Sequence, residues 1–136
     1  MRRLASLAML FALVASACSN GPAPPVPMSG RVVEKGRFDE TARGVAFTVA
    51  IDSADDYFSP TYIKAAPGAQ VTIDITNSGG IAHTFTIDEL GIDKSFGRKG
   101  DKATVRVVAP AAGKSLVFYC KYHRDAGIQG AIYSAP

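Results

Sequence analysis

The sequence predicts an all-β protein that folds as a β-sandwich of seven or eight short strands. Apolar and polar residues alternate over several short stretches, which is typical of half-buried strands. Turn-forming residues separate these stretches, and none of them has the repeat of an amphipathic helix. The chain has 136 residues, 47% of them hydrophobic, which is enough for one domain with a single core.

The clearest alternation covers residues 45–51, where Val45 and every second residue after it are apolar. Further strands are expected at close spacing, with turns such as Pro67-Gly68 between them. These strands are Tyr62–Lys64, Val71–Thr76, His83–Ile87, Lys94–Phe96, Val105–Val107, Leu116–Tyr119 and Ala131–Tyr133. Between them, Phe58–Pro60 is expected to be a bend, and Asp52–Asp56 a solvated acidic loop rather than a metal site.

The first residues have the form of an export signal. Two arginines precede an apolar run that ends at Val14, and small residues follow, so we expect residues 1–17 to be a signal peptide. The segment from Val14 to Cys18 resembles a bacterial lipobox, although alanine replaces the usual leucine. We therefore expect Cys18 to be lipidated, and the protein to be an exported, membrane-anchored lipoprotein facing the periplasm or cell surface. The alternatives are ordinary cleavage that leaves a spare thiol, and a disulfide between Cys18 and Cys120.

The rest of the chain divides into two parts. Residues 18–44 begin with a Pro/Gly-rich tether, Asn20–Gly30, and continue as a charged segment in which an edge strand around Val32-Val33 stays undecided. Residues 45–136 are expected to form the folded domain. The formal net charge is +3, and without the two arginines of the signal 13 basic residues face 12 acidic ones. This balance argues against a nucleic-acid-binding protein.

The residues that carry chemistry centre on the segment Phe118–Gly130. Cys120 follows the apolar run Leu116–Tyr119, which predicts that its thiol points inward at the end of a buried strand. His123 comes three residues later on the loop, and His83 lies on the apolar face of another alternating segment. One thiolate and two imidazoles are the ligand set of a mononuclear blue-copper site.

These motifs resemble those of the cupredoxins, in particular the plastocyanin-like and azurin-like electron carriers. The matching pieces are His83 in A-H-T-F, Cys120 and His123 in F-Y-C-x-Y-H, and a short last strand. The resemblance implies a cupredoxin-like Greek-key β-sandwich that holds one copper ion per chain through His83, Cys120 and His123. It also implies a monomeric type 1 copper protein that carries single electrons between redox partners, such as c-type cytochromes or a terminal oxidase or reductase.

The fourth position of the site departs from the family pattern. Plastocyanin-like proteins carry a methionine five residues after the loop histidine, whereas this chain has Ile128, which offers no donor atom. Gln129 and the carbonyl of Ala82 are candidate replacements, and the choice between them stays open. A site without an axial donor favours Cu(I), so we expect a raised reduction potential.

The resemblance makes His123 the edge through which electrons enter and leave. Thr84, next to His83, is either a tie between the two ligand-bearing segments or simply an outward-facing strand threonine. Lys121 and Arg124 flank His123 and would favour an acidic partner, unless they are ordinary solvated residues. An apolar docking rim is expected around His123, formed by Gly80, Ile81, Ala126, Gly127 and Ile128.

Other interpretations compete with the electron carrier. A Cys–His nucleophilic pair is the enzymatic one, and it fits poorly because Cys120 ends a buried strand. Zinc would prefer a fourth donor, which Ile128 does not supply. Two histidines leave none for the further copper centres of a multicopper oxidase, so we expect no enzymatic turnover. A copper-binding, copper-delivery or copper-linked assembly protein of the cell envelope is the alternative function.

Overall fold

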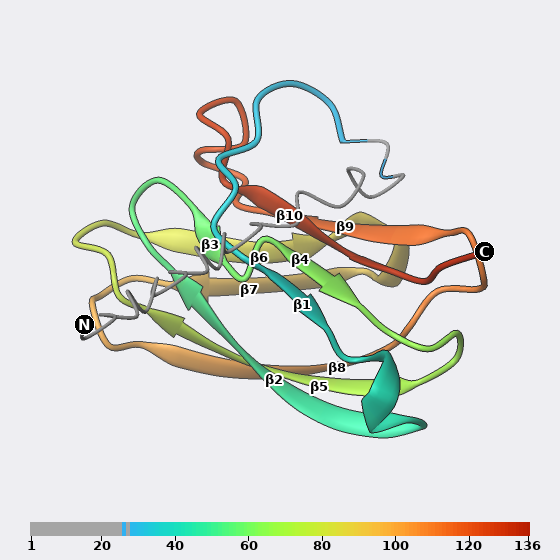
Figure 1. The fold of residues 1–136 in the computed structure, drawn as a ribbon. Helices are drawn as coiled ribbons and strands as arrows, with labels where there is room; N and C mark the ends of the chain where they lie inside the picture. Colours follow the sequence, from blue (N-terminus) through green and yellow to red (C-terminus); the bar gives the residue numbers. More distant parts are fainter. Residues whose placement is uncertain (1–25, 27) are drawn as a thin grey trace, which may run out of the picture.

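The chain folds into a sandwich of two β-sheets (Figure 1). The computed structural model describes residue 26 and residues 28–136, so the expected signal peptide and Cys18 lie outside the described residues. The larger sheet has six strands, in the spatial order β1 (Arg37–Asp39), β4 (Tyr62–Lys64), β10 (Gln129–Tyr133), β9 (Ser115–Tyr119), β6 (His83–Ile87) and β7 (Ile92–Phe96). The smaller sheet has four, in the order β3 (Phe58–Ser59), β2 (Ala46–Ser53), β5 (Gln70–Asn77) and β8 (Lys102–Val108).

Helical structure in the described part of the chain is confined to two short turns. Within the described residues there is no α-helix, and the two 3-10 turns are Thr41–Arg43 and Asp88–Leu90. No helix in this part of the chain is long and apolar enough to cross a membrane. The all-β, cupredoxin-like sandwich that the sequence predicts is therefore confirmed.

The strands number ten in the described residues rather than seven or eight. The two strands that the sequence pattern does not show are β1 and β3. All three side chains of β1 are exposed, and β3 has only two residues, so neither contains an apolar alternation. β1 pairs in parallel with β4, which places the edge strand of the 31–44 segment at Arg37–Asp39 and not around Val32-Val33.

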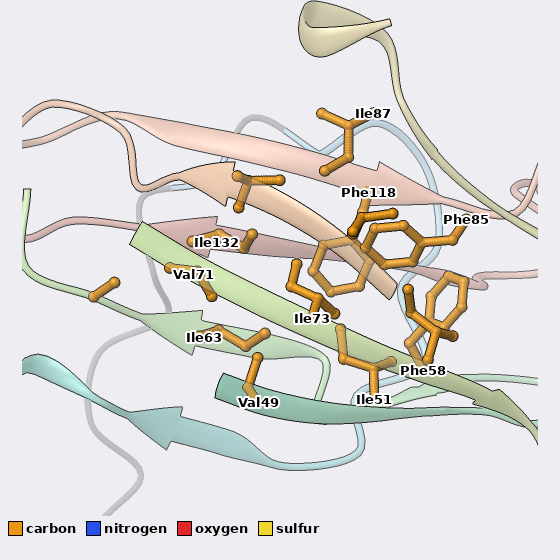
Figure 2. Packing of buried hydrophobic residues seen from close by; sticks show 14 of the residues in the cluster. Val49, Ile51, Phe58, Ile63, Val71, Ile73, Phe85, Ile87, Phe118 and Ile132 are labelled. Carbon is orange, nitrogen blue, oxygen red and sulfur yellow. The ribbon is translucent and has the colours of Figure 1, made fainter. Parts of the chain in front are cut away.

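The facing sides of the two sheets form one hydrophobic core (Figure 2). In β2 and β5 every second side chain is buried, as the alternation predicts. Val45 is the exception, since it precedes β2 and is 84% exposed. The observed strand therefore begins one residue later than predicted, because the chain enters the sheet only at Ala46.

Three phenylalanines fill the end of the core that lies under the ligand-bearing segments. Phe85 and Phe118 stack with ring centroids 5.0 Å apart, and Phe58 meets them edge-on at 5.8 and 5.4 Å (Figure 2). Each buried aromatic side chain contributes about 1.5–3 kcal/mol to folding. His83 and Cys120 lie two residues from Phe85 and Phe118 respectively, and therefore share the core-facing side of their strands.

Candidate metal centre

The three predicted ligands come from two neighbouring strands and the loop that follows one of them. His83 opens β6, and Cys120 follows directly after β9, which pairs antiparallel with β6. Both residues are fully buried, whereas His123 is half-buried on the loop between β9 and β10. Antiparallel pairing places the start of one strand beside the end of the other, which brings His83 and Cys120 to the same edge of the sandwich.

The side chains of the three residues converge. The Cys120 Sγ atom lies 3.8 Å from Nδ1 of His83 and 3.6 Å from Nδ1 of His123. One ligand atom from each residue lies within 4.8 Å of the other two, and the two imidazole rings meet edge-on at 5.4 Å. Among the described residues this is the one cluster of three or more His, Cys, Asp or Glu side chains with metal-binding spacing.

Tight turns in the loop after β9 bring His123 back towards Cys120. The backbone N–H of His123 donates to the Cys120 carbonyl at 3.2 Å, and the N–H of Ile128 donates to the His123 carbonyl at 3.2 Å. The N–H of Cys120 in turn donates to the carbonyl of Ile128 at 3.0 Å. These bonds close the loop on itself, so the position of His123 is fixed by backbone contacts rather than by its own side chain.

Thr84 connects the two ligand-bearing segments. Its backbone N–H points to the Cys120 sulfur at 3.4 Å, and its hydroxyl accepts the backbone N–H of Lys121 at 2.8 Å. The Thr84 hydroxyl then faces the Thr86 hydroxyl at 3.2 Å, and Thr86 donates to the Asp93 carboxylate at 3.2 Å. A chain of hydrogen bonds therefore runs from the loop between β9 and β10, called the ligand loop below, through buried β6 to β7.

The structure adds a residue that the sequence interpretation placed in a solvated loop. Asp55 lies in the turn between β2 and β3, and its Oδ1 is 3.2 Å from Nε2 of His83. The same carboxylate accepts the backbone N–H groups of Gly80 and Ile81 at 3.0 and 3.2 Å. These hydrogen bonds lower the pKa of Asp55 below its ordinary value, and the bond from Gly80 contributes most. No local pattern could have revealed the contact, since 28 residues separate Asp55 from His83.

The structure also shows where the two side chains considered for the fourth position, Ile128 and Gln129, lie. Ile128 is fully buried, and its backbone pairs with that of Cys120, so the two side chains share the core-facing side. Gln129 pairs with Tyr119 and points to the opposite side of the sheet. Its Nε2 donates to the carbonyls of Ser29 and Arg31 at 2.8 and 2.6 Å. Gln129 is thus turned away from Cys120, and the Ala82 carbonyl stays a prediction.

The chain before β1 packs against the ligand loop (Figure 1). The backbone N–H of Val33 donates to the carbonyl of Gly127 at 3.0 Å. Gly127 has a φ of 105°, and a Cβ there would lie 2.9 Å from Cγ2 of Val33. Glycine is therefore required both by the backbone conformation and by the closeness of this N-terminal segment.

The surface around His123 differs from the predicted docking rim. Gly80, Ile81 and Ala126 are exposed, whereas Gly127 and Ile128 are buried and cannot line it, because the N-terminal segment and the core cover them. Tyr122, which the sequence interpretation did not include, is 59% exposed and lies edge-on to His123 with ring centroids 6.2 Å apart.

The two basic residues beside His123 already have partners inside the protein. Lys121 Nζ lies 2.5 Å from Oδ2 of Asp93, and this pairing raises the pKa of Lys121 and lowers that of Asp93. The Arg124 guanidinium lies over the ring of Tyr119, 4.2 Å from its centroid. Asp93 offsets the charge of Lys121, whereas Arg124 keeps its charge above the ring.

The fold and the site together define a class of protein: β-sandwiches that bring one cysteine and two histidines together at one edge. A family model described as a cupredoxin-like domain matches residues 5–132, and the chain belongs to this family. A search of curated proteins found no match.

Solved structures share the fold at low sequence identity. Reduced auracyanin from Roseiflexus castenholzii has a TM-score of 0.55 and 19% identity, covering 65% of this chain and 97% of that chain. A second structure is the metal-binding domain of the Cu(I)-exporting P-type ATPase CopA of Streptococcus pneumoniae, solved with Cu(I). It has a TM-score of 0.58 and 13% identity, covering 74% of this chain and 97% of that chain. A chain of a heme-copper terminal oxidase dimer has a TM-score of 0.54 and 18% identity, covering 68% of this chain and 66% of that chain.

Proposed function

We propose that His83, Cys120 and His123 hold one copper ion and that the protein carries single electrons as a type 1 copper protein. The observation that carries this proposal is the convergence of the two Nδ1 atoms on the Cys120 sulfur, at 3.8 and 3.6 Å. A copper ion held by one thiolate and two imidazoles supplies reversible one-electron chemistry, because it can alternate between Cu(I) and Cu(II).

The donor set fits such an ion. With metal–sulfur and metal–nitrogen bonds of about 2.3 and 2.0 Å, a sulfur and a nitrogen that share one ion would lie less than about 4.3 Å apart. The two sulfur–nitrogen distances agree with this spacing. Ile128 presents hydrocarbon beside Cys120 where zinc would seek a fourth donor, so a three-ligand copper site fits better than a tetrahedral zinc site.

The residues of the chain hold the ligands in nearly fixed positions. Thr84 fixes the Cys120 sulfur through its N–H, and the closed loop fixes His123. Ligands that need not move between oxidation states keep the cost of electron transfer low. His123 is the half-buried ligand, and with Tyr122 exposed beside it, it offers the shortest path for an electron to a docked partner.

The same features argue against the enzymatic alternative. A nucleophilic thiol needs access to a substrate, and Cys120 is fully buried. We therefore propose an electron carrier that does not itself turn over a substrate.

We further propose that the carrier is an exported, monomeric lipoprotein anchored through Cys18, which faces the periplasm or the cell surface. The apolar leader and the lipobox-like segment support this location. Its partners would be redox proteins such as c-type cytochromes or a terminal oxidase or reductase. The likeness of the fold to a chain of a heme-copper terminal oxidase dimer supports the second partner class.

Copper delivery is the second candidate function. The observation that favours it is the likeness in fold to the metal-binding domain of a Cu(I)-exporting ATPase. The two functions differ in how the ion behaves, since a carrier retains its copper while a delivery protein releases it.

Copper exchange and redox cycling of the copper-loaded full-length chain distinguish these functions. A carrier should show a reversible one-electron redox titration and keep its copper for hours in the presence of a Cu(I) chelator. Release to the chelator within seconds, with no reversible redox wave, would support delivery and contradict the electron carrier.

A further inference from the structure

We propose that Asp55 positions His83 for metal binding, by fixing the tautomer and the orientation of its imidazole ring. The role rests on the proposed copper site, but the contacts that define it are present in the protein without metal. Asp55 Oδ1 lies 3.2 Å from Nε2 of His83, and the other ring nitrogen faces the Cys120 sulfur at 3.8 Å.

The chemistry of the carboxylate decides which nitrogen carries the proton. An ionised carboxylate can only accept hydrogen bonds, so Nε2 of His83 must be the protonated nitrogen of the neutral ring. Nδ1 then keeps its lone pair and points it towards Cys120, where a metal ion would need it. Because the His83 ring is fully buried, bulk water does not offer Nε2 an equivalent partner. Ligand histidines generally depend on such an outer hydrogen bond.

Asp55 is itself held in place by the loop before β6. It accepts the backbone N–H groups of Gly80 and Ile81, and Gly79 packs so close that a Cβ there would lie 2.0 Å from Asp55 Oδ1. The side chain of Asn77 fixes the same loop by accepting the N–H of Gly79 and donating to the Ile81 carbonyl. The carboxylate is therefore held by the loop before β6, and from this position it orients the His83 ring.

The charge of Asp55 has a second consequence for the same site. A carboxylate that accepts the Nε2–H bond makes the imidazole a stronger electron donor, which favours the more highly charged Cu(II). Ile128 withholds an axial donor and so acts in the opposite direction. The reduction potential is then set by two opposing residues, and Asp55 is the one that lowers it.

Two substitutions separate position from charge. Asp55→Ala removes both the hydrogen bond and the charge, whereas Asp55→Asn keeps an oxygen that can accept the Nε2–H bond and removes the charge together with the oxygen that accepts the Gly80 N–H. Asp56→Asn is the matched control. Asp56 is the exposed neighbour in the same turn and forms no hydrogen bond or ion pair with the residues that the structure describes.

The first readout needs no copper. In the metal-free full-length chain, ¹⁵N NMR of the imidazoles should show His83 as the Nε2–H tautomer in the wild type, Asp55→Asn and Asp56→Asn, and a tautomer mixture in Asp55→Ala. The second readout is copper binding, where Asp55→Ala should lose about 10–100-fold in affinity. The third is the reduction potential, which should rise in both Asp55 variants and stay near the wild-type value in Asp56→Asn.

The outcomes distinguish this inference from the proposed function. An unchanged His83 tautomer and an unchanged copper affinity in Asp55→Ala would overturn the positioning role. An equal shift of potential in Asp56→Asn and Asp55→Asn would show a general charge effect and overturn the specific one. If the wild-type chain bound no copper, the proposed function would fail, while the tautomer measurement would still decide whether Asp55 orients His83.

Discussion

The backbone N–H of Thr84 points to the sulfur of Cys120 from 3.4 Å away, across two neighbouring strands. The hydroxyl of the same threonine accepts the backbone N–H of Lys121 at 2.8 Å, so Thr84 contacts both Cys120 and the residue that follows it. The ligand loop and the strand of the first histidine are thereby locked together before any metal is bound.

Replacing Thr84 with valine should destabilise the protein. The valine keeps the shape and the N–H to the sulfur, but it leaves the Lys121 N–H without its acceptor, which costs about 1–3 kcal/mol. Denaturant unfolding of the metal-free chain measures the change. Thr48→Val is the matched control on the exposed face of β2 and should stay within about 0.5 kcal/mol of the wild type. Equal stability of the two variants would show that the Thr84 hydroxyl has no structural role.

Ile128→Met should lower the reduction potential of the copper-loaded protein. The thioether offers a weak axial donor beside Cys120, and this donor stabilises Cu(II). A redox titration with an optical readout checks the change. Ile132→Met makes the same exchange at another fully buried isoleucine of the core and should leave the potential unchanged. A potential in Ile128→Met that equals or exceeds the wild-type value would contradict the account of the fourth position.

Gln129→Leu should leave the copper spectrum unchanged while making the fold less stable. Gln129 points away from Cys120 and binds the carbonyls of Ser29 and Arg31, and losing a buried hydrogen-bonding group costs about 1–3 kcal/mol. Hydrogen exchange should show faster opening of the segment before β1. Gln70→Leu, at an exposed position, serves as the control. A changed copper spectrum would instead identify Gln129 as a ligand.

Gly127→Ala should destabilise the protein more than Gly113→Ala does. Both glycines have positive φ, so both substitutions carry backbone strain of about 1 kcal/mol. Only at Gly127 does the new Cβ also meet a neighbour, Cγ2 of Val33 at 2.9 Å. Thermal unfolding of the two variants gives the comparison, and adding Val33→Ala to Gly127→Ala should recover part of the loss. Equal destabilisation by the two glycine substitutions would mean that the N-terminal segment does not press on the ligand loop.

The alternating strands were predictable because each needs only local information. Residues two apart in a strand share a face, so the buried residues of β2 and β5 can be recognised from the sequence. β1 and β3 escaped prediction because they are short, and β1 has no buried side chain. Their pairing is decided by β4 and β2, which lie elsewhere in the chain.

The convergence of the three ligand residues was predictable because the order of His83, Cys120 and His123 resembles that of the cupredoxins, which implies that the three side chains meet. Thr84 could be inferred from its position beside His83. Asp55 could not, because its contact with His83 depends on how the turn between β2 and β3 lies against the loop before β6. The burial of Gly127 and Ile128 likewise follows from long-range packing, which removes them from the predicted docking rim.

The copper spectrum of the full-length chain shows whether His83, Cys120 and His123 form a type 1 site. Visible absorption and EPR are recorded as Cu(II) is added to the wild type, to Cys120→Ser and to Cys18→Ser, which removes the other cysteine. We expect an intense blue band and a narrow copper hyperfine pattern in the wild type and in Cys18→Ser, and the loss of both in Cys120→Ser. A pale wild-type protein with ordinary copper signals would contradict the type 1 site at His83, Cys120 and His123.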